Sequence, residues 1–493
     1  MKEKIKSLTD KIFGATPGDG EMQSKEALSF SICGFGQNII CTIIGSYLTV
    51  FMTDAIGFNA LAVAFLMLGA RIFDALNDPI MGSIVDRTRT KWGKCRPYLK
   101  WMALPIAIMT VICFLPWYPN TDGGFAAISI MYIIWGVIYT VADVPYWGLS
   151  TAMSNDTYRR GNLLTVARLF CTAGAGLVTI IVPIITEQVT KGLTPELASE
   201  KLRMTYFIIA VVCVIVSLPL FYIGFKNTEE RNLSTEKAPS LKHNLQLLFK
   251  NKPLMLIVLS GIGGAARLLF TYTGGLYFAK YIMDKESMYA LFTMAIVPGG
   301  LIASILVPYF TKKFGKRNTY IVSHLIGGVA MLVAFVVGIA FDHGNYTSTL
   351  TTVVLMIALV VAGVPSGLGN ILTYAMIGDT VEYLELKTGE RAEGICFAMQ
   401  TLINKIGMAV GAFVGVLAYY MAGVEANNAA SVTPEGKDTM WTMLVLIAAI
   451  SFFLTVIPLF FYKFNEKQQQ EAVAIINERK KAASEASEAE DKE

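Results

Sequence analysis

The most constraining feature of this chain is a succession of about twelve long apolar stretches. Each comes close to the roughly 20 mostly apolar residues that a helix needs to cross a lipid bilayer. The stretches cover residues 29–53, 59–85, 98–117, 124–149, 163–187, 204–225, 254–281, 288–310, 319–341, 349–377, 394–422 and 441–462. Charged residues make up 16% of the 493 residues, below the roughly 25% of soluble domains. We therefore expect an all-α polytopic membrane protein with about twelve transmembrane helices, and these spans exclude a soluble enzyme.

The second apolar stretch contains charged residues that are costly inside a membrane. Arg71, Asp74 and Asp78 lie near its middle and its inner end. An ionised side chain at the bilayer centre costs on the order of 2.5–3.5 kcal/mol, so such residues need partners and usually have a function. Asp74 and Asp78 are four residues apart, which places both carboxylates on one helix face with the amide of Asn77 beside them. Hard cations prefer such oxygen ligands, so the pattern indicates an ion-coupled membrane transporter.

The distribution of lysine and arginine predicts the orientation in the membrane. Basic residues are concentrated after the second, fourth, sixth and eighth stretches, as in segments 87–96 and 312–317. The positive-inside rule then places these connections and both termini in the cytoplasm of a cell whose inner (plasma) membrane holds the protein. No cleavable signal peptide is expected, because segment 1–28 is polar and the apolar run that follows is too long. We expect a monomer in the lipid bilayer, with a small-molecule substrate and no nucleic-acid partner.

Two halves are predicted from a weak internal repeat. The second and eighth stretches both run into short basic loops that contain glycine, six spans apart, as in parallel six-helix halves. We expect the following organisation: a cytoplasmic N-terminal segment over 1–28, a six-helix bundle over 29–226, a cytoplasmic linker over 227–252, a second six-helix bundle over 253–465, and a polar cytoplasmic tail over 466–493. The seven cysteines are scattered and no Walker A pattern is present, so no disulfide framework, zinc site, cofactor or ATP-driven transport is expected.

Several motifs together resemble the glycoside–pentoside–hexuronide:cation symporter family. They are Arg71 to Gly82, Arg89 to Pro97, Tyr139 to Trp147, Gly378 to Tyr383, and Gln400 to Lys405. They are spread over both halves, so the resemblance covers nearly the whole chain. It implies a major facilitator fold with alternating access around a central site. It also implies uptake of a sugar, glycoside or hexuronide coupled to inward movement of Na⁺, or of H⁺ or Li⁺.

The resemblance implies a cation site and an adjacent sugar site. The cation would be held by Asp74, Asn77, Asp78, Thr140 and Asp143, with Na⁺ at Asp74 and Asp78. The sugar would contact Gln37, Asn38, Tyr139, Asp143, Trp147, Arg168, Gln400, Thr401 and Lys405. Carboxylate and guanidinium groups form charge-assisted hydrogen bonds with hydroxyls, and an indole face stacks on a pyranose ring. It stays open whether the helix-two acids instead only pair with Arg71 and Arg168 to hold helices together.

The chain also departs from the family pattern and carries charged residues outside these motifs. Gln37 and Asn38 stand where melibiose-transporting members have a lysine and an acid, so an α-galactoside specificity is not implied. Arg267, in the seventh stretch, could bind a substrate carboxylate, or it could snorkel or pair with an acid. A set of charges at inner helix ends could form gating ion pairs between the halves. This set is Asp86, Arg87, Arg159, Arg160, Asp379, Glu382 and Arg391.

Two alternative functions stay open at this point. One is a lysophospholipid:cation symporter, because distant relatives of the resembled family carry such lipids. The other is a non-transporting sensor on a transporter scaffold, which would not need the cation site.

Overall fold

The computed structural model describes residues 10, 13, 22–154, 157–231, 241–390 and 393–490. All the named elements in this part of the chain are helices, accompanied by two isolated bridges. Ten of the described helices or helix series are long and apolar enough to cross a membrane. The other two expected spans, 59–85 and 98–117, correspond to the helices α4 (Ala60–Arg87) and α5 (Arg96–Cys113).

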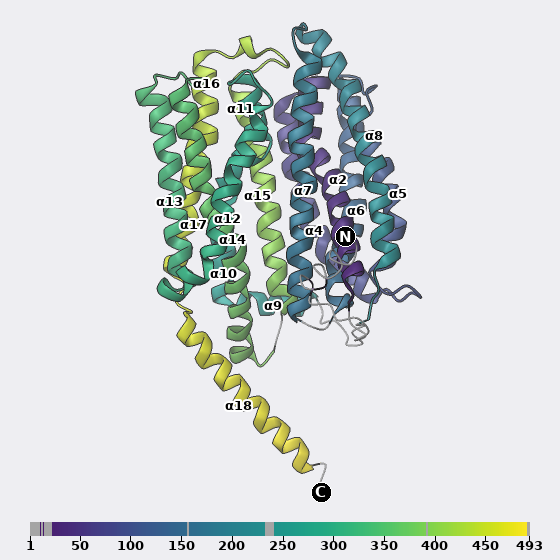
Figure 1. Ribbon diagram of the computed structural model, residues 1–493, viewed down its shortest axis with the longest axis vertical. Helices are drawn as coiled ribbons and strands as arrows, with labels where there is room; N and C mark the ends of the chain where they lie inside the picture. Colours follow the sequence, from purple (N-terminus) through teal and green to yellow (C-terminus); the bar gives the residue numbers. More distant parts are fainter. Residues whose placement is uncertain are drawn as a thin grey trace. The chain divides into compact units, whose positions relative to one another are not determined.

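Residue contacts divide the chain into two units, and unit 1 holds the first six spans. Its elements are α2 (Ser24–Thr42), η1 (Ile43–Tyr47), α3 (Leu48–Val50), η2 (Phe51–Ile56), α4, α5, α6 (Asp122–Met153), α7 (Thr157–Thr190) and α8 (Pro195–Asn227). The helix α2 packs against α7 and α8, whereas α6 packs against α4 and α5 (Figure 1). The four elements from α2 to η2 form one continuous first span.

Unit 2 holds most of the second half of the chain. Its elements are α9 (Leu241–Lys250), α10 (Lys252–Gly263), η3 (Ala265–Thr271), α11 (Thr273–Tyr281), α12 (Met288–Phe314), α13 (Lys316–Val336), η4 (Val337–Phe341), α14 (Thr349–Thr388), α15 (Glu393–Met421), α16 (Pro434–Trp441), η6 (Thr442–Leu446), α17 (Ile447–Phe460) and α18 (Glu466–Glu490). The helix α13 packs against α14 and α17, and α15 packs against η3 (Figure 1).

Two short segments of the second half belong with unit 1. They are 279–290, which connects α11 to α12, and 423–432, which contains η5 (Ala429–Ser431) and connects α15 to α16. The bundle boundaries predicted from the sequence stay a prediction, and residues 232–240 of the predicted linker lie outside the described residues.

Local sequence explains where several of the helices begin and end. Side-chain oxygens of Asn59, Thr121 and Ser348 accept backbone N–H groups in the first turns of α4, α6 and α14, as helix N-caps do. Gly57 follows η2 with φ +87°, and Gly389 follows α14 with φ +76°. Glycine adopts this left-handed conformation without a steric penalty, which ends a helix sharply.

A carboxylate from the end of unit 1's last span binds the start of α5. Glu230 accepts the backbone N–H groups of residues 94–96 at 2.7–2.8 Å, which satisfies donors that a helix start leaves unpaired. Gly93 has φ +104°, and a Cβ there would lie 2.4 Å from the Glu230 carboxyl carbon. The guanidinium of Arg96 donates to the Phe225 carbonyl at 3.0 Å, near the end of α8.

Unit 2 repeats this arrangement six spans later. Glu466 follows α17 and accepts the backbone N–H of Lys316 at 2.6 Å, at the start of α13. Gly315 precedes it with φ +78°, and the next residue, Arg317, donates to the Leu459 carbonyl at 2.8 Å. The two basic loops therefore share more than composition. In each, a glycine, a basic segment and a distant glutamate tie the third helix of a half to the end of its sixth helix.

Candidate transport site

Asp74 lies where α4 and α6 approach each other closely. Its side chain is buried, and a Cβ on Gly136 of α6 would lie 2.7 Å from its Oδ1. Arg71 Nη1, one turn earlier on α4, lies 3.7 Å from Asp74 Oδ2. Thr140 is buried one turn after Gly136, on the same face of α6. The structure therefore places a carboxylate and a guanidinium against the helix that carries the predicted threonine ligand.

The rest of the predicted cation site continues along α4. Asp78 is half-buried one turn after Asp74. The Nδ2 atom of Asn77 is buried, and no described atom accepts a hydrogen bond from it. Within the described residues, no group of three or more His, Cys, Asp and Glu side chains is arranged to hold a metal ion. The predicted site also includes Asp143 of α6 and the neutral ligands Asn77 and Thr140, and cation binding there stays a prediction.

Asp143, on α6, is linked directly to the first span. Gln37 Nε2, on α2, donates to Asp143 Oδ1 at 2.7 Å. The Gln37 side chain is 1% exposed, and its Oε1 has no hydrogen-bond partner in the described structure. Leaving a buried acceptor unsatisfied costs about 1–3 kcal/mol. A ligand hydroxyl that donates to Gln37 Oε1 would remove this cost.

Other predicted sugar-site residues lie on α2, α6 and α7. The guanidinium of Arg168, on α7, lies 4.6 Å from the centre of the Trp147 ring on α6. This is a cation–π contact between two predicted sugar residues. Tyr139 stacks on Trp135 with ring centres 4.8 Å apart. Asn38 instead donates to a carbonyl one turn earlier in its own helix, at 3.0 Å.

Three predicted sugar-site residues lie on α15 of unit 2. Gln400 Nε2 donates to Asn404 Oδ1 at 3.2 Å, while Gln400 Oε1 is buried and accepts no hydrogen bond from the described residues. Lys405 is half-buried and Thr401 is exposed. Sugar contacts at these positions stay a prediction.

Arg267 lies at a break in the seventh span. The 3₁₀ helix η3 separates α10 from α11, and Leu268 within it has non-helical backbone angles. Ser451 Oγ accepts the Ala266 N–H at 3.1 Å and donates to the Gly263 carbonyl at 2.8 Å. Broken helices occur at membrane depth where protein or a cavity satisfies the backbone. Arg267 Nη1 donates to the carbonyl of residue 264 at 2.8 Å, and its buried Nε has no described hydrogen-bond partner.

Two of the charged residues predicted to form gating pairs between the halves instead have partners within their own half. Asp379 pairs with Lys316 at 2.6 Å, and Glu382 accepts a hydrogen bond from Gln469. All four residues belong to unit 2. Arg87 is exposed, whereas Arg159 and Arg160 are half-buried. Arg391 and the side chain of Asp86 lie outside the described residues. Gating pairs between the halves stay a prediction.

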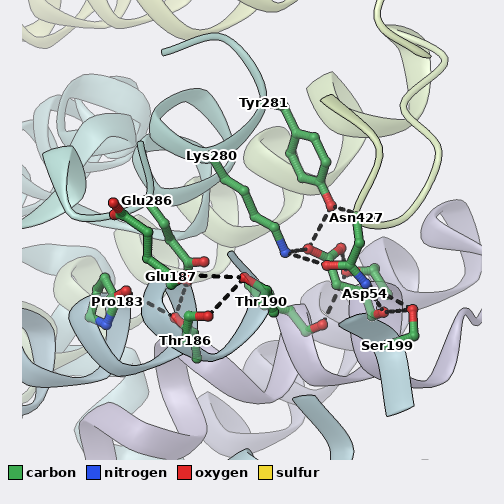
Figure 2. A network of polar contacts seen from close by, with 12 residues as sticks. Asp54, Pro183, Thr186, Glu187, Thr190, Ser199, Lys280, Tyr281, Glu286 and Asn427 are labelled. Atoms are coloured by element: carbon green, nitrogen blue, oxygen red, sulfur yellow. Dashed lines mark hydrogen bonds and ion pairs between the residues drawn. The ribbon is translucent and has the colours of Figure 1, made fainter. Parts of the chain in front are cut away.

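Unit 1 also holds a buried polar cluster that the sequence did not indicate, here called the Asp54 network. It consists of Asp54, Ser199, Lys280, Tyr281 and Asn427 (Figure 2). The fully buried Asp54 carboxylate pairs with the Lys280 ammonium and accepts from the Tyr281 hydroxyl at 2.6 Å. Lys280 also donates to Asn427 Oδ1 at 2.8 Å. The Asn427 amide donates to Ser199 Oγ and to the Asp54 carbonyl, both at 2.8 Å.

The Asp54 network holds segments 279–290 and 423–432 in unit 1. Asn427 adopts φ +56° and donates its backbone N–H to the Tyr281 hydroxyl at 3.0 Å. Asparagine tolerates this left-handed conformation better than most residues. Asp54 is 226 residues from Lys280 and 373 from Asn427, so no local pattern could join them. The one available signal in the sequence was Asp54 itself, an acidic residue that directly follows the apolar stretch 29–53.

Comparison with known proteins identifies the family. Residues 29–466 match the family model described as MFS/sugar transport protein. The chain belongs to this family. Similar curated proteins include an isoprimeverose transporter of Lactiplantibacillus pentosus, 28% identical over 90% of this chain and 89% of that protein. A glucuronide carrier protein homolog of Escherichia coli K12 is 27% identical over 94% of this chain and 97% of its own length.

Solved structures confirm the fold. The nucleoside transporter NupG aligns with a TM-score of 0.56 at 17% identity, covering 89% of this chain and 100% of that one. A D-xylose–proton symporter aligns with a TM-score of 0.56 at 16% identity, covering 87% and 96%. The family match and the curated relatives make the chain a multi-pass membrane transporter and not an enzyme, and the solved structures show its major facilitator fold. Its assignment to the glycoside–pentoside–hexuronide:cation symporters, made from motifs, is confirmed.

Proposed function

We propose that the protein is a secondary active symporter that couples inward movement of Na⁺, or of H⁺ or Li⁺, to uptake of a sugar, glycoside or hexuronide by alternating access. The observation that carries this proposal is the set of charged side chains in the spans of unit 1, with Asp74 beside Arg71 and Asp143 bonded to Gln37. Charges at membrane depth are expensive and are kept for function. The names of the relatives, which include an isoprimeverose transporter and a lactose permease of Lactobacillus helveticus, support a sugar as the substrate.

The proposed cation role follows from the chemistry of α4. Asp74 and Asp78 lie on one helix face, where two carboxylates repel each other unless a cation or proton neutralises one of them. Arg71 offsets part of the charge of Asp74 from one side. A Na⁺ ion would complete the neutralisation, with Asn77 and Thr140 adding neutral oxygen ligands of the kind that hard cations take.

Asp143 supplies the proposed link between cation and sugar. One of its oxygens is bound to Gln37 Nε2, so its position fixes the orientation of the Gln37 amide. The unsatisfied Gln37 Oε1 would then accept a sugar hydroxyl, with the Trp147 ring and the Arg168 guanidinium as further contacts. A cation that orders Asp143 would order the sugar site as well, so sugar binding must tighten cation binding by the same factor.

The direct test is thermal unfolding of the purified protein with a ligand panel, with and without Na⁺. The panel holds neutral glycosides, pentosides, hexuronides and lysophospholipids, since any ligand that binds the folded state raises the apparent unfolding temperature by mass action. We expect a sugar or hexuronide to stabilise more strongly in Na⁺, and uptake of that ligand into proteoliposomes to require an inward Na⁺ gradient. A response to lysophospholipid alone would replace the sugar with a lipid. Binding without uptake would identify a sensor and refute the proposal.

A further inference from the structure

Segment 279–290 buries an acidic side chain next to the Asp54 network. Glu286 is 4% exposed and accepts a hydrogen bond from the Thr186 hydroxyl, on α7, at 2.7 Å (Figure 2). The next residue, Ser287, donates its backbone N–H to the Glu187 carboxylate at 2.7 Å. The turn before it contains Asp284 with φ +52°. Two glutamates therefore hold the segment against the end of α7: Glu286 of the segment accepts from α7, and Glu187 of α7 accepts from the segment.

The charges around Glu286 do not offset its burial. Within the described part of the chain, no Lys, Arg or His side chain lies within ion-pair distance of it. The ammonium of Lys280 favours the ionised carboxylate but is already bound to Asp54. Asp54 and Glu187 both act against ionisation. The hydroxyl of Tyr47 is electrostatically coupled to Glu286 and also to the hydroxyl of Tyr289.

Burial is the main reason why the Glu286 carboxyl group binds its proton more tightly than a glutamate in water. Desolvation raises the pKa of Glu286 from 4.5 to about 7, against the opposing effects of Lys280 and the Thr186 hydroxyl. A glutamate in water returns to its ordinary pKa. Any movement that withdraws segment 279–290 from unit 1 would therefore hydrate Glu286 and release its proton near neutral pH.

We propose that Glu286 is the proton-binding site of a lock, formed with the Asp54 network, that holds segments 279–290 and 423–432 in unit 1. This inference rests on the alternating access proposed above, because both segments are continuous with helices of unit 2 and must leave unit 1 if the two units move apart on this side. In the topology predicted from the basic residues, this is the outer side. Locking binds one proton at Glu286, and unlocking returns it to the outer solution.

The sign of the pH dependence follows from the two proton affinities. The locked state binds the proton more tightly, so acid favours locking. This preference is complete below pH ~4.5 and is lost as the pH rises through about 7. For one site with these two values, the ratio of locked to unlocked protein falls about tenfold between pH 6 and pH 8. The Asp54–Lys280 ion pair supplies a second, separate part of the lock.

Hydrogen–deuterium exchange of the full-length protein measures this lock without a label. Peptides covering 279–290 and 423–432 report the backbone N–H groups of Ser287 and Asn427, which donate to Glu187 and Tyr281 only in the locked state. After correction for the intrinsic exchange rate at each pH, we expect the open fraction of both segments to rise about tenfold from pH 6 to pH 8. Two variants sharpen the test. Glu286→Gln, which mimics the protonated acid, should show a flat profile with both segments protected at both pH values.

Thr186→Val removes the hydroxyl that favours the ionised carboxylate, so its opening midpoint should move to higher pH, a shift that general loss of stability would not produce. Glu187→Gln tests the opposite direction, because it removes a carboxylate that acts against ionisation of Glu286. Its opening should stay pH-dependent, with the midpoint moved to lower pH. An unchanged slope in Glu286→Gln, or a wild-type change of less than twofold, would overturn the proton site. Neither result would contradict the proposed sugar symport, which is tested separately by the Na⁺-dependent stabilisation by ligands.

Discussion

A double-mutant cycle on Asp54 and Lys280 measures how strongly the Asp54 network holds its two segments. Asp54 is fully buried and Lys280 is 13% exposed in side-chain terms, so removing one partner leaves a buried charge without its counter-ion. Breaking a buried pair in this way costs about 3–5 kcal/mol. Asp54→Asn and Lys280→Met should each lower the unfolding temperature of the purified protein and raise exchange in segments 279–290 and 423–432. The double variant removes both charges, so it should be no less stable than either single variant.

The control for this cycle is Lys285→Met, the same substitution at an exposed lysine five residues further along. A surface change of this kind should alter stability by no more than ~0.5 kcal/mol. If the two single losses add in the double variant, Asp54 and Lys280 are not coupled. That result would show that the Asp54–Lys280 pair does not hold the two segments in place.

Three other changes test separate parts of the structure. Asp74→Asn should abolish the Na⁺ dependence of sugar-induced stabilisation, and a retained Na⁺ effect would remove Asp74 from the cation site. Arg267→Gln should weaken the binding of a hexuronide by at least about tenfold, which corresponds to ~1.4 kcal/mol, and should leave the binding of neutral glycosides unchanged. Isothermal titration calorimetry measures both affinities. Equal losses of affinity for both ligand classes would mean that Arg267 has a structural role. Glu230→Gln should destabilise the protein by about 1.5–3 kcal/mol, because the carboxylate receives three N–H groups. The exposed neighbour Glu229→Gln serves as its control, and equal thermal shifts for the two variants would refute this role.

The spans and the family could be predicted from the sequence because both signals are local. A helix that crosses lipid must be apolar along its own length, so each span is visible without knowledge of its neighbours. The family is visible because its motifs are short and spread over both halves. The break at η3 was less visible, because the glycines near 261–264 are equally compatible with close helix packing.

The side-chain contacts were only partly predictable, because they depend on helices distant in sequence. Gln37 and Asp143 are 106 residues apart in the sequence, and the family resemblance placed both in one site. The structure shows a hydrogen bond between them. Their contact with a sugar stays a prediction. The resemblance offered nothing comparable for Asp54 and Asn427. The bond between them needs the left-handed turn at 427 and the burial of two connecting segments, neither of which a hydropathy pattern expresses.

The proposed transport mechanism requires cation and sugar to bind in a coupled pair of sites around Asp143. The most direct measurement determines four dissociation constants for the purified protein: the sugar with and without saturating Na⁺, and Na⁺ with and without saturating sugar. We expect each ligand to tighten the binding of the other by the same factor, in the range of about 5–150-fold. Two sugar constants that are identical with and without Na⁺, together with two identical Na⁺ constants, would contradict it.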